Sequence, residues 1–278
     1  MTPGNEKIAR ALLGFYSNAG VDALLEEAPV DRFADDTPPP AAAIRAPRPQ
    51  APASASPGAA ARTVAAPPPA PPDEAAMAAR EAARGAGTLD ELRAILERFD
   101  GCALKPSATQ LVFADGNPEA RLMVVGEAPG RDEDIEGLPF VGRSGKLLDR
   151  MLAAIGLDRS GVYIANVVPW RPPGNRTPTP QETQICLPFI LRQIELVDPD
   201  ILVCMGNPST QTLLGTRDGI TKTRGRWFTF NTGKRDIRAM PTFHPAFLLR
   251  SPLQKRFAWR DFLAIRKALD SRSNPDGR

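Results

Sequence analysis

The sequence is poor in cysteine and histidine and contains no long apolar run. Its three cysteines, Cys102, Cys186 and Cys204, are too few and too far apart for a disulfide scaffold. No stretch approaches the roughly 18 consecutive apolar residues of a membrane-spanning helix, and residues 1–10 lack the basic and apolar segments of a secretory signal. Because His244 is the single histidine and no cysteine pair has ligand spacing, a zinc-type site is not expected. These absences predict a reduced, cytoplasmic protein that does not cross a membrane.

Proline, by contrast, is abundant and unevenly placed. Of the 30 prolines, 12 lie in residues 37–72, together with 13 alanines. A segment of this composition buries too little apolar surface to offset the entropy that it loses on ordering. We therefore predict an N-terminal helical segment at 1–30, a Pro/Ala-rich disordered linker at 31–84, and one folded domain at 85–278.

The N-terminal part leaves its own role open. Apolar residues recur at helical spacing between Glu6 and Glu27, and such a helix could dock on the folded domain or recruit a partner protein. Residues 73–84 are rich in alanine and also favour a helix, although an isolated helix of this length is marginal in water. Residues 1–84 hold 8 basic and 10 acidic side chains, and residues 85–278 hold 27 and 22. The basic excess of the domain is compatible with nucleic acid, but it is equally typical of a solvated surface.

Short apolar runs alternate with helical patterns in the folded domain. Four runs predict strands, and a shorter run is a further candidate: 122–125, 162–168, 201–205, 238–243 and, shorter, 111–113. Helical patterns lie between and after them: 146–155, 181–197, 209–214 and 254–269, preceded by a helix that begins at Thr88 with capping-box spacing. This alternation predicts an α/β fold, a three-layer sandwich with a central, mostly parallel four-stranded sheet. Ligand sites in such sheets lie beyond the carboxyl ends of the strands.

A Gly-rich loop follows the first of these strands. It begins with Gly126-Glu127-Ala128-Pro129-Gly130 and continues through several acids to Phe140. A phosphate-binding Walker loop needs Ser or Thr after its lysine, but Leu147 follows Lys146, and the dinucleotide pattern GxGxxG is absent as well. The loop is therefore either a structural turn or a rigid site of another kind.

Two further strand ends carry polar side chains. Asn166 ends the second strand, ahead of the Pro- and Arg-rich loop 171–178, and its amide could offer a donor and an acceptor to a ligand or cap a turn. His244 follows the fourth strand directly and precedes Pro245. A lone histidine is usually structural, but this one is placed at the same edge of the sheet as the other two loops.

Taken together, these motifs resemble one family. GEAPG at 126–130, EDxxGxPFVGxSG at 133–145, Asn166 with RPPGNRTPTP at 171–180, and HPAFLLR at 244–250 occur in this order. They resemble the family 4 uracil-DNA glycosylases of the uracil-DNA glycosylase superfamily over about residues 99–269. The resemblance implies a monofunctional enzyme of base excision repair, which flips uracil out of DNA and hydrolyses its N-glycosidic bond.

The resemblance also implies roles for individual residues. Phe140 would stack on the extruded base, and Asn166, with Glu133 nearby, would bind the uracil edge. His244 would bond the uracil oxygen that gains charge as the glycosidic bond breaks.

The acidic and basic motif residues have implied roles as well. Glu127 and Asp134 would orient water or stabilise the cationic sugar. Contacts to the DNA backbone are implied for four residues: Gly130, Arg176, Arg250 and Ser251.

One departure from the family concerns its iron–sulfur cluster. Typical members hold a [4Fe–4S] cluster on four cysteines. Cys102 and Cys186 match two of those positions, whereas Phe99 and Trp170 stand at the other two. Because two thiolates cannot hold such a cluster in the usual way, we expect no cofactor, with aromatic packing in its place.

The leading hypothesis is thus a monomeric uracil-DNA glycosylase that acts on single- or double-stranded DNA, with a possible protein partner at residues 1–30. A non-catalytic nucleic-acid-binding or replication-associated module on the same fold is the alternative, although it would not need the four side chains Glu127, Phe140, Asn166 and His244. A covalent uracil-trapping relative would carry a basic loop before its histidine, and residues 238–241 are not such a run.

Overall fold

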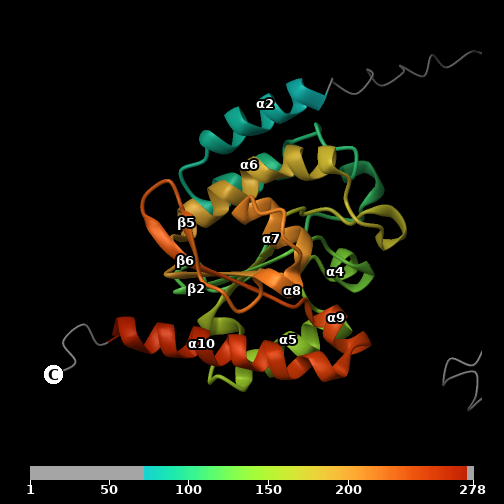
Figure 1. The fold of residues 1–278 in the computed structure, drawn as a ribbon. Coiled ribbons are helices and arrows are strands. Elements are labelled where there is room, and N and C mark those ends of the chain that lie inside the picture. The colour runs from blue at the N-terminus through green and yellow to red at the C-terminus, as the bar shows by residue number, and fades with distance from the viewer. Residues whose placement is uncertain (1–71, 274–278) are drawn as a thin grey trace, which may run out of the picture. The chain divides into compact units, whose positions relative to one another are not determined.

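The computed structural model describes residues 72–273, so the predicted segment 1–30 and most of the linker 31–84 lie outside the described residues. A six-stranded mixed sheet forms the centre, in the order β1-β3-β2-β4-β6-β5 (Figure 1). The strands are β1 (Asp115–Gly116), β2 (Leu122–Gly126), β3 (Tyr163–Asn166), β4 (Ile201–Met205), β5 (Phe228–Asn231) and β6 (Asp236–Thr242). The four central strands are parallel, and β1 and β5 are antiparallel at the two edges.

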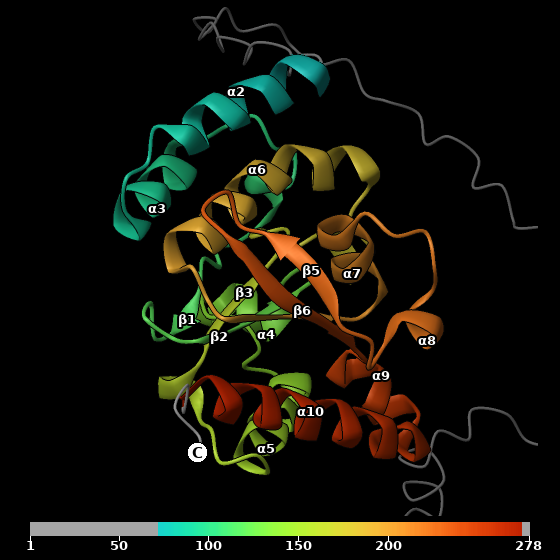
Figure 2. The ribbon, with the colours of Figure 1, turned by 60° about the vertical axis from the view of Figure 1, so that its left-hand side comes forward.

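The predicted α/β class and the four parallel strands are confirmed, and the structure adds both edge strands. β1 has only two residues, and β5 forms a hairpin with β6 (Figure 2). Neither edge strand contains a continuous apolar run of the kind that identifies a central strand. Residues 111–113 form no strand, although Val112 is buried and its N–H donates to the Pro169 carbonyl at 2.9 Å.

Helices cover both faces of the sheet, as the predicted three layers require. Their bounds are α2 (Pro72–Arg84), α3 (Leu89–Arg98), α4 (Arg131–Glu136), α5 (Arg143–Ala153), α6 (Pro180–Val197), α7 (Asn207–Leu214), α8 (Ile220–Thr223), α9 (Pro245–Arg250) and α10 (Lys255–Ser273). Short 3-10 turns lie at Lys105–Ser107, Arg159–Gly161, Pro173–Asn175 and Pro252–Gln254. On β2, Met123 and Val125 pack toward α6, whereas Leu122 and Val124 pack toward α5 and α10. This alternation buries both faces of one strand. No helix within residues 72–273 is long and apolar enough to cross a bilayer.

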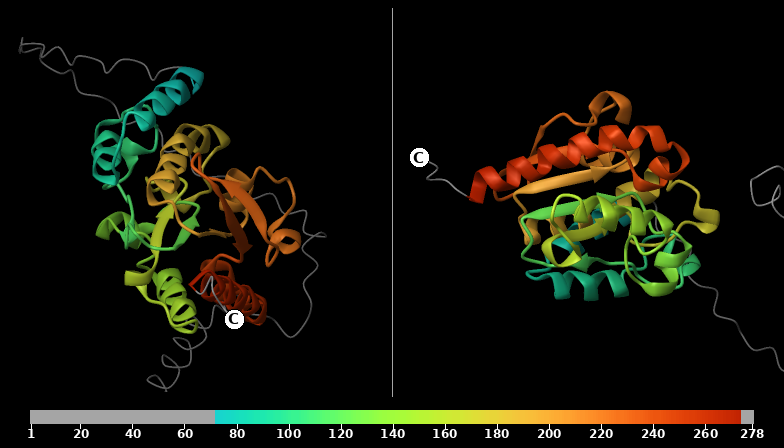
Figure 3. Two further views of the ribbon diagram at one scale, coloured as in Figure 1. Left: turned by 90° about the vertical axis from the view of Figure 1, so that its left-hand side faces the viewer. Right: turned by 90° about the horizontal axis from the view of Figure 1, so that it is seen from below.

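The first described helix, α2, lies where the linker was expected to continue to residue 84. It packs on the outer side of α6 (Figure 3). Four alanines at helical spacing form its buried stripe: Ala75, Ala76, Ala79 and Ala83. Their small side chains allow the two helices to approach closely, and α6 supplies the packing surface that an isolated alanine-rich helix lacks. Ordered structure therefore begins before the domain boundary drawn at residue 85.

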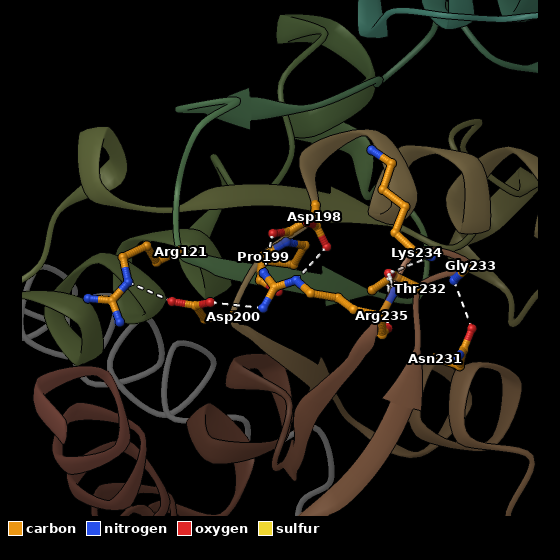
Figure 4. Close-up of polar contacts among 9 residues, drawn as sticks. All are labelled: Arg121, Asp198, Pro199, Asp200, Asn231, Thr232, Gly233, Lys234 and Arg235. Atoms are coloured by element: carbon orange, nitrogen blue, oxygen red, sulfur yellow. Dashed lines mark hydrogen bonds and ion pairs between the residues drawn. The ribbon is translucent and has the colours of Figure 1, made fainter. Parts of the chain in front are cut away.

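A polar network ties together the amino ends of β2, β4 and β6 (Figure 4). Arg235 contacts Asp198 at 2.9 Å and Asp200 at 3.2 Å, and Asp200 also pairs with Arg121 at 2.6 Å. These residues precede their strands, so the network fixes one end of the sheet. The motif residues gather at the opposite, carboxyl end.

Candidate active site

The carboxyl ends of three parallel strands surround one cavity. Glu127 follows β2, Asn166 ends β3 and His244 follows β6. In the sheet, β2 has β3 on one side and β4 on the other, so the chain continues to opposite sides of β2. Such a change in the direction of strand order creates a crevice at the carboxyl ends of the strands in α/β sheets. The cavity measures about 210 Å³. It is lined by Glu127, Ala128, Pro129, Gly130, Glu133, Phe140, Ser144, Asn166, Pro172, Asn175, Arg176, Thr177, Pro178, His244 and Ala246.

The backbone around Phe140 is held in an unusual conformation. Phe140 has φ 56°, a left-handed value that a bulky residue rarely adopts. Arg159 stabilises this turn, because its guanidinium donates to the carbonyls of Pro139, at 3.1 Å, and of Phe140. Gly145 is required beside it, since a Cβ there would overlap the Phe140 carbonyl. The result is a fixed ring that stacks on His244, with centroids 5.4 Å apart and planes 27° from parallel.

Asn166 presents a free acceptor beside this ring. Its Oδ1 is buried and has no hydrogen-bond partner within residues 72–273. Gly126 lies directly opposite in the β2–β3 register. A Cβ at Gly126 would collide with Asn166 Oδ1 and lie 2.7 Å from Phe140 Cζ. The glycine therefore leaves room for the amide and the ring to face one space.

His244 is held as a neutral imidazole. It caps the N-terminus of α9, where its Nδ1 accepts a hydrogen bond from the Ala246 N–H at 3.1 Å. Burial, and secondarily the charge of Arg250, lower the pKa of His244 to about 4. Because Nδ1 is an acceptor, the remaining proton lies on Nε2, which can donate to a ligand.

Glu127 is the carboxylate of the cavity whose bonding is incomplete. Its Oε1 is buried without a partner within residues 72–273. Burial raises the pKa of Glu127, and the neighbouring Thr177 hydroxyl opposes that rise. An underbonded carboxylate in a polar cavity is suited to accept a proton from water or to stabilise a nearby positive charge.

The other two expected acids have structural contacts. Asp134 does not line the cavity and instead accepts from the N–H and hydroxyl of Thr109, both at 2.8 Å. Glu133 lines the cavity, but its carboxylate accepts from three backbone N–H groups at 3.0–3.1 Å: those of Gly130, Val141 and Gly142. Glu133 thus links the loop around Phe140 to the Gly-rich loop 126–130 by hydrogen bonds. Asp134 binds Thr109, in the segment that precedes β1.

A second hollow of about 430 Å³ adjoins the cavity and shares part of its wall. It is lined by Arg131, Asp132, Glu133, Gly142, Arg143, Ser144, Asn175, Ala246, Leu249 and Arg250. Its three arginines, Arg131, Arg143 and Arg250, outnumber its two acidic residues, Asp132 and Glu133. None of the three arginines has an ion pair within residues 72–273. We refer to this hollow as the arginine groove.

The remaining expected DNA contacts differ in their surroundings. Arg176 lines the cavity, but it forms two hydrogen bonds to Glu182, at 2.7 and 2.8 Å. The Gly130 N–H is already bonded to Glu133, and Ser251 ends α9 without lining either hollow. Close to Ser251, Leu253 is 84% exposed, an unusual setting for leucine.

Sequence reasoning missed several residues that build this site. Arg159 lies 19 positions after Phe140 in an unrelated segment, and no local pattern connects the two. Arg131 and Arg143 stand inside the motifs that identified the loops, but motif spacing does not distinguish a free arginine from a paired one. Within the described residues neither arginine forms an ion pair, and this is a property of the tertiary structure.

The four residues at which the resemblance places cluster ligands, Phe99, Cys102, Trp170 and Cys186, include only two thiols. The sulfur atoms of Cys102 and Cys186 lie 3.9 Å apart. Trp170 is buried in the same apolar cluster, against which Phe99 also packs, and neither side chain can ligate iron. Within residues 72–273, no group of three or more His, Cys, Asp or Glu side chains could hold a metal ion. The donor set therefore does not fit a [4Fe–4S] cluster.

Comparison with known proteins agrees with this geometry. The sequence pattern of the uracil-DNA glycosylase superfamily matches residues 113–263. This chain belongs to that superfamily. It is 43% identical to the type-4 uracil-DNA glycosylase of Thermotoga maritima over 169 residues, which cover 59% of this chain and 86% of the relative.

Two further type-4 uracil-DNA glycosylases are similar to this chain to a comparable degree. The type-4 uracil-DNA glycosylase of Archaeoglobus fulgidus is 38% identical over 182 residues, 64% of this chain and 92% of the relative. That of Saccharolobus solfataricus is 39% identical over 189 residues, 66% of this chain and 88% of the relative. This superfamily member thus aligns with 86–92% of the length of these three relatives.

Proposed function

We propose that this chain is a DNA glycosylase that hydrolyses the N-glycosidic bond of uracil in DNA. One observation carries the proposal: Asn166, whose Oδ1 has no partner within residues 72–273, lines the same cavity as the stacked Phe140 and His244 rings. A flipped base needs a flat apolar surface for its ring and polar partners for its edge. The membership in the uracil-DNA glycosylase superfamily supports uracil as that base.

Asn166 supplies the selectivity for uracil. Uracil presents an N3–H donor beside an O4 acceptor, and one side-chain amide complements both groups. Asn166 Oδ1 is the free acceptor that receives N3–H, and the amide NH₂ donates to O4. Cytosine reverses this pattern, so it leaves a buried polar group without a partner, which costs about 1–3 kcal/mol.

His244 stabilises the departing base. As the glycosidic bond breaks, negative charge develops on a uracil carbonyl oxygen, and the neutral imidazole donates its Nε2–H to that oxygen. The fixed Nδ1 contact to Ala246 aims the ring before reaction, so no reorganisation is needed at the transition state.

Glu127 acts on the sugar side of the bond. The sugar acquires oxocarbenium character as the base leaves, and a carboxylate close to it stabilises that charge and accepts a proton from the attacking water. Glu133 and Asp134 support this centre by holding the loops, since their oxygens are bonded to backbone or to Thr109.

The arginine groove gives the DNA backbone a path to the cavity. Arg131, Arg143 and Arg250 meet phosphates without first breaking an ion pair, and each neutralised phosphate strengthens binding at low salt. Leu253 is exposed and follows the groove residue Arg250 by three positions, so it is a candidate to fill the stack that a flipped nucleotide leaves.

We propose that the protein folds and acts without an iron–sulfur cluster, because Phe99 and Trp170 replace two thiolates and pack in the apolar core. Iron analysis and a visible spectrum of anaerobically purified protein test this. A brown protein with about four irons per chain would contradict it.

Excision is tested with pure protein and uracil-containing or matched thymine-containing oligonucleotides, followed by alkaline cleavage. Asn166→Asp should lower uracil excision by about 2–4 kcal/mol in activation free energy, because a carboxylate cannot donate to O4. Asn231→Asp, in the exposed edge strand β5, is the control and should retain wild-type rates. Wild-type excision by Asn166→Asp would remove Asn166 from base recognition, and absence of excision by the wild type would refute the function.

A further inference from the structure

Another, much smaller cavity adjoins Glu127 and shares no lining residue with the arginine groove. It measures about 20 Å³ and is lined by Glu127, Val167, Val168, Thr177, Pro178, Thr183, Pro208 and Thr212. Thr183 belongs to α6, and Pro208 and Thr212 belong to α7, so two helices close it on top of the β2 and β3 ends. We call it the threonine cavity.

The threonine cavity shares a wall with the cavity of about 210 Å³ that Phe140, Asn166 and His244 line, which we call the base cavity. Glu127, Thr177 and Pro178 line both spaces. The Glu127 carboxylate therefore borders both spaces. One of its oxygens, Oε1, is buried and lacks a partner within residues 72–273.

The dimensions and chemistry of the threonine cavity fit a single water molecule. A buried water needs roughly 10–15 Å³ and two to four polar partners, and this cavity offers about 20 Å³. Its polar groups are the Glu127 carboxylate and the hydroxyls of Thr177, Thr183 and Thr212, and the rest of the lining is valine and proline. A nucleobase or a second water does not fit in this volume.

We propose that the threonine cavity holds one water molecule that donates to the Glu127 carboxylate, and that Thr183 and Thr212 hold this water. They are then positioning residues, which act on the reaction through Glu127 and touch no substrate. A donor to a carboxylate favours its ionised form. The water thus opposes the effect of burial, which raises the pKa of Glu127. The inference rests on the proposed function only for its activity assay.

Few other charges face Glu127. In the base cavity these are Glu133, Arg176 and His244. Glu133 is bonded by loop N–H groups, Arg176 is paired with Glu182, and His244 is neutral above about pH 5 because its pKa is about 4. The threonine cavity adds no charged side chain besides Glu127. A change in Glu127 titration on loss of a threonine hydroxyl therefore reports the hydroxyl and its water.

The test is the pH dependence of uracil excision by Thr212→Val and Thr183→Val under single-turnover conditions. The acidic limb of the profile should move about 0.5–1 unit to higher pH, because the carboxylate loses a donor and protonates more readily. At a fixed pH on that limb, the rate of the variant should be about three- to tenfold lower than that of the wild type. On the alkaline plateau the two rates should agree within about twofold.

Two variants provide matched controls. Thr212→Ser keeps the hydroxyl and should keep the wild-type profile. Thr210→Val removes a hydroxyl from the same helix, where it bonds the Gly206 carbonyl at 2.7 Å and lines neither cavity. This variant should leave the limb unmoved. An equal loss of rate at every pH in Thr212→Val, or a limb that does not move, would overturn the inference.

A direct titration separates this inference from the proposed function. The side-chain carboxyl carbon of Glu127, assigned in a ¹³C-glutamate sample with the help of Glu127→Gln, can be followed by NMR without any substrate. A higher midpoint in Thr212→Val than in the wild type supports the water even if the protein excises no uracil. Equal midpoints refute it even if uracil excision is fully active.

Discussion

Replacing Trp170 with alanine should destabilise the domain strongly. Trp170 is 2% exposed and heads the largest fully buried side chains of residues 74–271. It packs in one cluster with Cys102 and Cys186, at a position where the family resemblance places a cluster ligand. Emptying a buried tryptophan site costs about 3–5 kcal/mol. In a domain of about 200 residues this loss lowers the midpoint of thermal unfolding by roughly 6–20 °C.

Thermal and urea unfolding, followed by circular dichroism, measure the effect. Trp259→Ala is the matched control, because Trp259 is 44% exposed on α10 and loses less burial on truncation than Trp170 does. We expect it to cost clearly less than Trp170→Ala, because the free-energy loss follows the apolar area removed from burial. Phe99→Ala should fall between the two, since Phe99 is partly buried with its ring 5.0 Å from that of Phe189.

Two results would refute this reasoning. If Trp170→Ala unfolded at the wild-type midpoint, tryptophan packing would not be what stabilises the region between Cys102 and α6. If instead the wild type contained iron and the variant lost it together with its stability, the destabilisation would come from the cluster and not from apolar burial.

Three further predictions concern the site and the domain boundary. Gly126→Ala should reduce excision about 100-fold and shift the unfolding midpoint by only a few degrees, because its Cβ would displace the Asn166 amide; near-normal kinetics would show that the amide is not fixed. Stability should fall by up to about 3 kcal/mol as the pH drops from about 6.5 to about 4, since the folded pKa of His244, about 4, lies below its unfolded value and the unfolded chain binds the extra proton. In His244→Gln, the free energy of unfolding measured with urea should depend less on pH over this range, and an unchanged dependence would assign it to other groups. A chain that begins at residue 70 should match the full-length protein in excision and stability, whereas one that begins at Gly85 should lose about 3 kcal/mol with the alanine stripe of α2; equal stability of the two would mean that α2 adds nothing.

The sequence alone determined the central strands and the placement of the main site residues. The runs 122–125 and 201–205 are continuously apolar because both faces of a central parallel strand are covered by helices. Glu127, Asn166 and His244 each come directly after such a run or at its end. Parallel strands carry all their carboxyl ends at one edge, so the convergence of these three side chains follows from the fold class.

The tertiary structure decided which polar groups are free and which are already bonded. Three carboxylates of the segment after β2 look alike in sequence. Glu133 and Asp134 are satisfied by backbone and threonine donors, whereas Glu127 keeps an oxygen without a partner within residues 72–273. The support that Arg159 gives to the Phe140 turn, and the packing of α2 on α6, also join segments distant in the chain. The physical reason is common to these cases: local patterns record burial and backbone preference, whereas hydrogen-bond partners and packing surfaces come from whichever segments the fold brings together.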